Sequence, residues 1–349
     1  MTTASRRGGG TAPGPANPVL VEVTRGHMAE SRHRGAVAVV DAAGGVKLAV
    51  GEVERPVYAR SGIKPIQALV VLETGAGEAF ALGEEEIALA CASHGGEKGH
   101  TDLVSAWLDR IGCTVDDLEC GPQTPLDEAA ARALHGAGEA PSALHNNCSG
   151  QHAGFLSVAR HLGLPTKGYI GRDHPVQQRA LRILEEMGET DLSAVPQGID
   201  GCGIPVVGLP LSRIALAMAR LANPESQPEP RRAAAARIRR AMAAEPFLVA
   251  GTNRFCTRVM EVTGARALVK EGAEGVCCGA LPELGLGIAL KVDDGASRAA
   301  SVVMGRLLRH FRVLGADEAD LLADVLEPAV CNPAGLEVGR VRPAADCPF

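Results

Sequence analysis

The chain has 349 residues and a formal net charge of −6, and only 3% of its residues are aromatic. Nucleic-acid binding needs clustered positive charge for phosphates and aromatic rings for base stacking, so this composition speaks against nucleic-acid partners. No apolar run is long enough to cross a bilayer as a helix, and none follows the first arginines as in a secretory signal. We therefore expect a cytoplasmic protein with a small-molecule partner and no membrane association.

The first 17 residues are rich in glycine and proline, and we expect them to form a disordered tail. Apolar and alternating segments then predict an opening antiparallel sheet, with a tight turn at Gly44-Gly45 between two of its strands. Helical periodicity follows, interrupted by glycine-rich loops. The expected strands are 18–26, 34–42 and 47–53, and the expected helices are 61–73, 82–93, 101–111, 127–135 and 152–162, the last approached by the loop 148–151.

The second half begins with a helix at 173–188 that has Pro175 near its start and Gly188 at its end. The glycine-rich segment 197–210 is expected to be a turn, and the arginines of the helix 231–242 are expected to face solvent. Antiparallel strands, a long helical middle, further strands and a final helix predict one α+β unit over residues 18–349. Its remaining elements are helices at 210–222, 297–314 and 317–326, strands at 265–281 and 286–295, and an edge strand at 337–343.

Ten cysteines occur in the chain. Since no export signal precedes them, we do not expect a disulfide framework, because reducing cytosol keeps thiols free. Five cysteines lie in or beside apolar segments, where a buried thiol behaves as a small apolar group. These are Cys91, Cys113, Cys256, Cys277 and Cys278.

The segment YARSGIKPIQ, residues 58–67, carries a pattern with chemical meaning. Pro65 restricts a helix to starting near Ser61, and residues three apart share a helical face, so the Lys64 amine could reach the Ser61 hydroxyl. A serine becomes a nucleophile only if a base takes its proton, and a lysine is a base only when it is neutral. The alternative is an ordinary serine cap at a helix start.

A Ser-x-x-Lys helix start resembles that of penicillin-binding proteins and class A β-lactamases, which add an S-D-N loop and a K-T-G strand. Neither of these two motifs is present here in its usual letters. In the matching order, however, Ser93 opens SHGGE after a helix and Lys270 ends ARALVK. Two lysines in one cleft would lower each other's pKa.

Six motifs extend the resemblance, in the order ARSGIKPIQAL, ASHGGE, NNCSGQHAGF, GYIGRDHPVQ, GIDGCGIPV and VKEGAEGV. Together they resemble the Rhizobium etli type L-asparaginases, from about Pro18 to about Arg342. The resemblance implies a serine β-lactamase-like fold, a homodimer, and hydrolysis of L-asparagine to aspartate and ammonia. It also implies that Ser61 is the nucleophile and Lys64 its base, and that Ser93 and Lys270 form a second serine–lysine pair. The substrate contacts that it implies are Arg60, His152 and Asp200.

The resemblance further implies a zinc ion held by Cys148, Cys202 and a lysine three residues after the first cysteine. Gln151 stands at that third position. An amide oxygen is a weak ligand for zinc, which prefers thiolate and imidazole. We therefore expect zinc to bind more weakly than in relatives with lysine, and not to activate the nucleophile.

The sequence thus predicts an amidohydrolase in which Ser61 attacks the side-chain amide of L-asparagine and the two lysines move protons. Two alternatives stay open at this point. One keeps the fold and changes the substrate to another acyl compound, such as a β-lactam or a small peptide. The other is a non-catalytic binding protein whose thiols sense redox state or metal.

Overall fold

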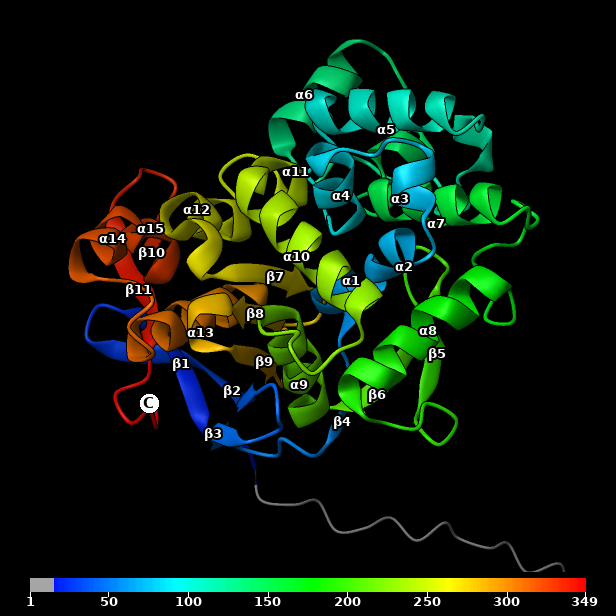
Figure 1. Ribbon diagram of the computed structural model, residues 1–349. Helices are drawn as coiled ribbons and strands as arrows, with labels where there is room; N and C mark the ends of the chain where they lie inside the picture. The colour runs from blue at the N-terminus through cyan, green and yellow to red at the C-terminus, as the bar shows by residue number, and fades with distance from the viewer. Residues whose placement is uncertain (1–15) are drawn as a thin grey trace, which may run out of the picture.

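The computed structural model describes residues 16–349, and its main feature is an eight-stranded antiparallel sheet with helices packed on it (Figure 1). The strand order is β10-β11-β1-β2-β9-β8-β7, and β3 pairs with β2 beyond the end of β1. These strands are β1 (Val19–Arg25), β2 (Met28–Asp41), β3 (Val46–Val50), β7 (Leu268–Gly272), β8 (Val276–Leu281), β9 (Leu286–Val292), β10 (Ala329–Cys331) and β11 (Glu337–Pro343).

Two helices, α9 (Leu211–Ala222) and α13 (Ser297–His310), cover opposite faces of this sheet. Gly287 of β9 faces α9, and a Cβ there would lie 2.1 Å from backbone atoms of that helix. The next residue along the strand, Ile288, points to the other face, because side chains alternate along a strand. Its cross-strand partner Gly279 faces Met304 of α13. Glycine at position 287 therefore allows α9 to pack directly on the strand backbone.

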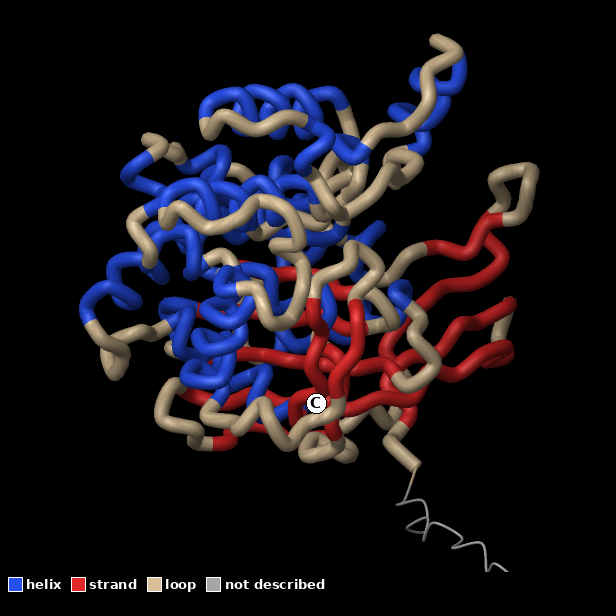
Figure 2. The backbone as a smooth tube through the Cα atoms, turned by 90° about the vertical axis from the view of Figure 1, so that its right-hand side faces the viewer, coloured by secondary structure: helices blue, strands red, loops and turns tan. Residues whose placement is uncertain are grey.

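Most of the other helices form a helical region on one side of the sheet, and Figure 2 shows the strands gathered away from it. The helices α14 (Ala316–Leu321) and α15 (Ala323–Leu326) lie apart from this region, beside β10 and β11 (Figure 1). The α-helices are α1 (Lys64–Gln67), α2 (Leu69–Glu73), α3 (Ala76–Ala79), α4 (Glu84–Ala90), α5 (Lys98–Arg110), α6 (Glu128–Gly136), α7 (Ser149–His161), α8 (Pro175–Gly188), α10 (Glu229–Ala244), α11 (Pro246–Ala250), α12 (Phe255–Thr263), α14 (Ala316–Leu321) and α15 (Ala323–Leu326). Single turns of 3₁₀ helix are η1 (Arg60–Ile63), η2 (Val115–Asp117), η3 (Ala143–His145), η4 (Gly264–Arg266) and η5 (Pro282–Leu284).

A small second sheet has the order β4-β6-β5, with β4 (Pro56–Tyr58), β5 (Gln197–Ile199) and β6 (Pro205–Pro210). Segment 197–210, expected to be a turn, therefore contains two strands joined by a short loop. The strand β4 ends just before Arg60, and the loop between β5 and β6 carries Asp200 and Cys202. The small sheet thus brings two separate parts of the chain to one place.

The predicted antiparallel sheet with a helical region is confirmed, and three expected elements are corrected. The helix expected at 61–73 is divided into η1, α1 and α2, and Pro65 lies at the junction between the first two. The strand expected at 265–281 is a hairpin of β7 and β8, with Glu274 and Gly275 at positive φ in its turn. The strand at 337–343 is not an edge strand, because β10 and β1 pair with its two sides.

The arginine-rich helix is also only partly as expected. Arg231 of α10 is 5% exposed, and its guanidinium binds both carboxylate oxygens of Glu73, at 2.7 and 3.1 Å. This contact ties α10 to α2. Arg231 is therefore part of the packing of the helical region, not of a solvated face.

The expected tail of residues 1–17 lies mostly outside the described residues. Asn17, which is described, is buried. Its amide nitrogen donates to Asp293 at 2.8 Å, and its amide oxygen accepts from the backbone N–H of Glu52 at 2.8 Å. Asn17 therefore belongs to the folded unit. Over residues 16–349, no helix combines the length and apolar character needed to span a membrane.

Candidate active site

Ser61 lies in a strained turn between β4 and α1. Arg60, the residue before it, has a φ of +50°, a left-handed conformation that residues with a side chain rarely adopt. The following Gly62 is pressed against β8, where a Cβ would lie 2.8 Å from the Sγ of Cys278. The turn therefore holds Ser61 in a fixed position, half-buried beside an internal cavity.

This cavity has a volume of about 20 Å³, enough for about one water molecule. It lies between the start of α1, the start of α7, helix α8 and the loop between β5 and β6. Seven of the residues singled out from the sequence line it, namely Arg60, Ser61, Lys64, Cys148, Gln151, Asp200 and Cys202. The structure therefore brings these distant positions together around one point.

Lys64 is 2% exposed, and its ammonium donates to the carbonyl oxygen of Ala92 at 2.6 Å and to the sulfur of Cys148 at 3.1 Å. Among the hydrogen bonds of residues 16–349, none joins Lys64 to Ser61. An ammonium has three hydrogens to donate, so these two contacts leave one for a further acceptor.

Cys148 is the residue immediately before α7, and Cys202 comes from the loop between β5 and β6. A hydrogen bond from the Cys202 thiol, together with the positive charge of Lys64, lowers the pKa of Cys148 to about 6 despite its burial. The same contact raises the pKa of Cys202. These shifts favour the thiolate form of Cys148, next to the ammonium of Lys64.

Arg60 and Asp200 form an ion pair through two hydrogen bonds, from Nε at 3.0 Å and from Nη2 at 2.9 Å. Burial alone would raise the pKa of Asp200, but the hydrogen bonds and charge of Arg60 outweigh it and hold that pKa below its usual value. The Asp200 carboxylate is therefore ionised. The fork of two parallel bonds fixes the orientation of Arg60.

Lys270 lies on β7 opposite Cys278 and is 1% exposed. Its ammonium donates to the carbonyl oxygen of Glu271 at 2.7 Å. Burial lowers the pKa of Lys270 to about 8; Cys256 opposes this shift, and the positive charge of Lys64 adds to it. Lys270 is therefore close to the neutral state that a basic lysine needs.

Ser93 follows α4 and is 7% exposed. Its backbone N–H donates to Val249, and its side-chain oxygen is buried with no hydrogen-bond partner in the described structure. It directly follows Ala92, whose carbonyl binds Lys64. Ser93 and Lys270 do not line the cavity at Ser61. Both are linked to Lys64, Ser93 through the neighbouring carbonyl of Ala92 and Lys270 through the positive charge of Lys64.

His152 also lies outside the cavity lining, in the first turns of α7. Its Nδ1 is 2.6 Å from the hydroxyl of Tyr169, which itself accepts from the backbone N–H of Glu119 at 3.1 Å. Burial lowers the pKa of His152 to about 3, so the ring is neutral. A neutral Nδ1 can accept the hydrogen of the tyrosine hydroxyl, and in that tautomer Nε2 carries the ring hydrogen. That Nε2 is buried without a partner in the described structure.

Two side chains at the site were given no role from the sequence, although both stand in the quoted motifs. Tyr169 contacts the Nδ1 of His152, as just described. Gln67 lines the cavity and accepts a hydrogen bond from the Nε2 of Gln151 at 2.7 Å. The spacing of Gln67, six residues after Ser61 and three after Lys64, is the signal that could have identified it.

The donor set at Cys148 and Cys202 does not fit a closed zinc site. Two sulfurs are present, but the Cys148 sulfur already accepts from Lys64, and the amide nitrogen of Gln151 is used by Gln67. Across residues 16–349, no group of three or more His, Cys, Asp or Glu side chains could hold a metal ion. Structural zinc sites have four strong ligands.

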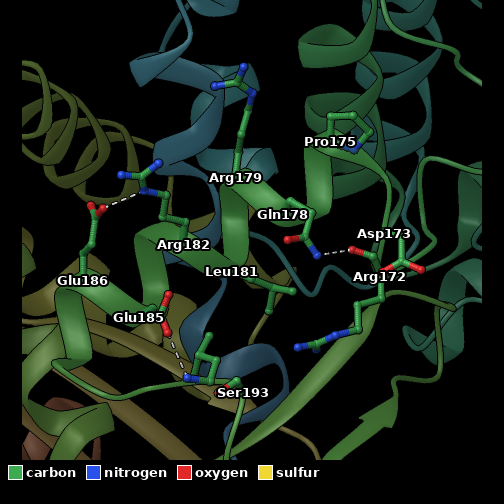
Figure 3. Close-up of a pocket in the computed structure, with 11 residues that line it drawn as sticks. Arg172, Asp173, Pro175, Gln178, Arg179, Leu181, Arg182, Glu185, Glu186 and Ser193 are labelled. Atoms are coloured by element: carbon green, nitrogen blue, oxygen red, sulfur yellow. Dashed lines mark hydrogen bonds and ion pairs between the residues drawn. The ribbon is translucent and has the colours of Figure 1, made fainter.

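A wide groove lies outside the cavity, along α8 (Figure 3). Its volume is about 950 Å³, and charged side chains such as Arg172, Arg179 and Arg182 line much of it. Figure 3 shows Leu181 among these charged residues, and the same side chain also lines the cavity at Ser61. Leu181 is therefore a shared wall between the groove and the cavity.

Comparison with known proteins gives one family and several distant structures. The family described as L-asparaginase II matches residues 21–343. No curated protein matches the chain. Similar solved structures include Mglu in its native form, with 15% identity, a TM-score of 0.46, and coverage of 87% of this chain and 71% of that one. A β-lactamase from Mycobacterium bovis has 14% identity and a TM-score of 0.41, over 79% of this chain and 94% of that one.

Proposed function

The chain belongs to the L-asparaginase II family, and from this membership we propose that it hydrolyses L-asparagine to L-aspartate and ammonia. The observation that carries the proposal is the position of Ser61, held by a left-handed residue at a cavity that also contains a buried lysine and an Arg–Asp pair. A hydroxyl so placed can attack an amide carbon that enters the cavity. The product of that attack is an acyl-enzyme, formed as ammonia leaves, and water then releases aspartate.

The proton of Ser61 must pass to a base. The base has to be a neutral amine, so Lys64 must first give up a proton, and the Cys148 sulfur that accepts its hydrogen bond is a neighbouring group that can take it. The amine takes the serine proton and returns it to the departing nitrogen, which leaves as ammonia. Lys270, with its lowered pKa, is the second group that can exchange a proton with Lys64 or Ser93. The water that releases aspartate uses the same groups in reverse.

Two groups are suited to the substrate carboxylate. Arg60 keeps unused guanidinium hydrogens after its two bonds to Asp200, and a guanidinium binds carboxylates strongly. The neutral His152 offers the hydrogen on its unpartnered Nε2. Neither contact requires a metal ion, and the proposed reaction uses none. The family resemblance also supports a homodimer, which light scattering of the purified protein would test.

The test is ammonia release from L-asparagine by the purified protein and by its Ser61→Ala variant. We expect release by the parent and a loss of at least a thousandfold in the variant, as for other serine nucleophiles. Ser212→Ala is a control for removing a serine hydroxyl, because Ser212 lies outside the cavity and its buried side-chain oxygen has no partner in the described structure. It should keep activity. No release by the parent, with or without added zinc, would overturn the proposal.

A further inference from the structure

The helices α1 and α7 face each other through two side-chain contacts that lie one turn apart. In the first, Lys64 donates to Cys148 at 3.1 Å, and in the second, Gln151 donates to Gln67 at 2.7 Å. Each contact joins residues 84 positions apart, and the second lies three residues further along both helices. The hydrogen bond between Gln151 and Gln67 therefore lies next to the contact between Lys64 and Cys148, on the side away from Ser61.

The amide contact leaves one polar atom unsatisfied. Gln151 is 2% exposed, and its side-chain oxygen is buried with no hydrogen-bond partner in the described structure. Leaving a buried acceptor unpaired costs about 1 to 3 kcal/mol. Gln151 and Gln67 both line the cavity that Ser61 lines. A ligand that brings a hydrogen-bond donor into this cavity would satisfy the oxygen.

The chemistry of an amide oxygen limits which group of the substrate can bind at this position. Gln151 carries no charge of its own, and its unpartnered side-chain atom is an acceptor. A carboxylate has no hydrogen to offer an amide oxygen. Of the groups on L-asparagine, only the α-ammonium and the side-chain amide nitrogen can donate.

The position of Ser61 distinguishes these two groups. The amide carbon of the substrate must lie against Ser61 for attack, so the amide nitrogen is held there as well. Gln67 lies at the end of α1, beyond Lys64, and binds Gln151 there. The α-ammonium is not held at Ser61, and it is the donor left free for Gln151.

We propose that Gln151, held in place by Gln67, binds the α-ammonium group of the substrate through its amide oxygen. This assignment rests on the proposed asparaginase activity. It gives Gln151 a positive role at the position where the family resemblance implies a zinc-binding lysine. The subsite selects α-amino acid amides over amides that lack the amino group.

Two ligands that differ in the α-amino group test the assignment, namely L-asparagine and succinamate. Calorimetry in a Ser61→Ala background measures binding without turnover. Gln151→Met should weaken L-asparagine binding about tenfold or more, since hydrogen bonds to charged groups contribute about 1.5 to 3 kcal/mol. Succinamate lacks the α-amino group, so its binding should change less than about twofold in the Gln151→Met variant. Gln151→Glu retains an acceptor oxygen and should keep the preference for L-asparagine.

Gln177→Met is the matched control. Gln177 is also 2% exposed, lies on α8, has a buried amide nitrogen without a partner in the described structure, and does not line the cavity. It should leave the binding of both ligands unchanged. Equal loss of both ligands in Gln151→Met, or no loss of either, would overturn the assignment while leaving the asparaginase proposal standing. Absence of L-asparagine binding and turnover in the parent would overturn both.

Discussion

The ammonium of Lys64 donates a hydrogen bond to the sulfur of Cys148 at 3.1 Å, and this contact is buried beside Ser61. Lys64 is the predicted base of the reaction, and its partner Cys148 can itself gain or lose a proton. Cys148 can therefore determine how often Lys64 is neutral, although no hydrogen bond among residues 16–349 joins it to Ser61.

The first prediction concerns the thiolate of Cys148. Ultraviolet thiolate absorbance of the parent should titrate with a pKa of about 6. Lys64→Met should raise this pKa, because the variant removes a positive charge that favours the thiolate. Cys148→Ser should abolish the titration. Cys113→Ser is the control, since burial raises the pKa of Cys113 and its removal should leave the signal near pH 6 intact.

The second prediction concerns Lys270, whose folded pKa of about 8 lies below the ordinary 10.5. Between these values the unfolded chain binds more protons than the folded protein, so the free energy of unfolding rises with pH across that window. The stability gained from this group is fully present above pH 10.5 and is lost as pH falls through 8. The free energy of unfolding should change by about 3 kcal/mol across this window, since one pKa unit corresponds to about 1.4 kcal/mol.

Urea unfolding at several pH values on both sides of pH 8 measures this effect. Lys270→Met should flatten the rise and should be more stable than the parent below pH 8. Lys98→Met, at a side chain that is 86% exposed, should leave the pH slope of the parent unchanged. If neutral Lys270 takes part in the reaction, kcat/KM of the parent should also rise toward pH 8. A parent whose stability does not change with pH in this window would contradict the lowered pKa.

The third prediction concerns the ion pair of Arg60 and Asp200, whose side chains are 24% and 17% exposed. A double-mutant cycle with Arg60→Lys and Asp200→Asn should give a coupling energy of about 1 to 3 kcal/mol in the free energy of unfolding. Lysine cannot reproduce the two parallel bonds, so Arg60→Lys should also raise KM. The same cycle on the exposed pair Lys98 and Asp102 should give about 0.5 kcal/mol or less. Equal coupling in the two pairs would contradict the structure.

The fourth prediction concerns the wall formed by Leu181. The cavity of about 20 Å³ is too small for an amino acid, so a substrate that enters from the groove must displace this side chain. Leu181→Ala should therefore raise the association rate of L-asparagine severalfold in stopped-flow binding, and Leu181→Trp should lower it. Leu192 lines the groove but not the cavity, so Leu192→Ala should leave the rate unchanged. Equal rates in all variants would place the entry route elsewhere.

The fifth prediction concerns the metal. Elemental analysis of the parent should find much less than one zinc per chain, because Cys148 and Cys202 lack strong further ligands. Gln151→Lys restores the residue implied by the family resemblance and should raise zinc content toward one per chain. Combining it with Cys202→Ser should remove the gain. A parent that holds one tightly bound zinc would show that the donor set is sufficient after all.

Local patterns predicted much of the fold and several members of the site. Alternation and helical periodicity identified most of the segments that became strands and helices, because these signals depend on neighbouring residues. The spacing of Ser61 and Lys64 located the candidate nucleophile, and the family motifs added Arg60 and Asp200. The structure places all four around one cavity. Their chemical roles remain predictions.

Other features depend on contacts between distant residues and left no local signal. The contact between Gln67 and Gln151 joins two helices 84 residues apart, and the pairing of Lys64 with Cys148 does the same. The strand at Glu337–Pro343 was expected at an edge because its pairing partners cannot be read from its own residues. The strands in the glycine-rich segment 197–210 were missed for a related reason, since glycine favours turns in local statistics.

The place of β11 between β10 and β1 has a consequence for protein synthesis. Thr24 of β1 meets Arg340 of β11 across 316 residues of chain. At the usual 5 to 20 residues per second, a ribosome needs roughly 15 to 60 s to make that stretch. Throughout this interval the outer side of β1 has no partner strand, and an unpaired strand edge is prone to aggregation. The nascent chain must therefore be protected longest at its first strand, although that strand leaves the ribosome first.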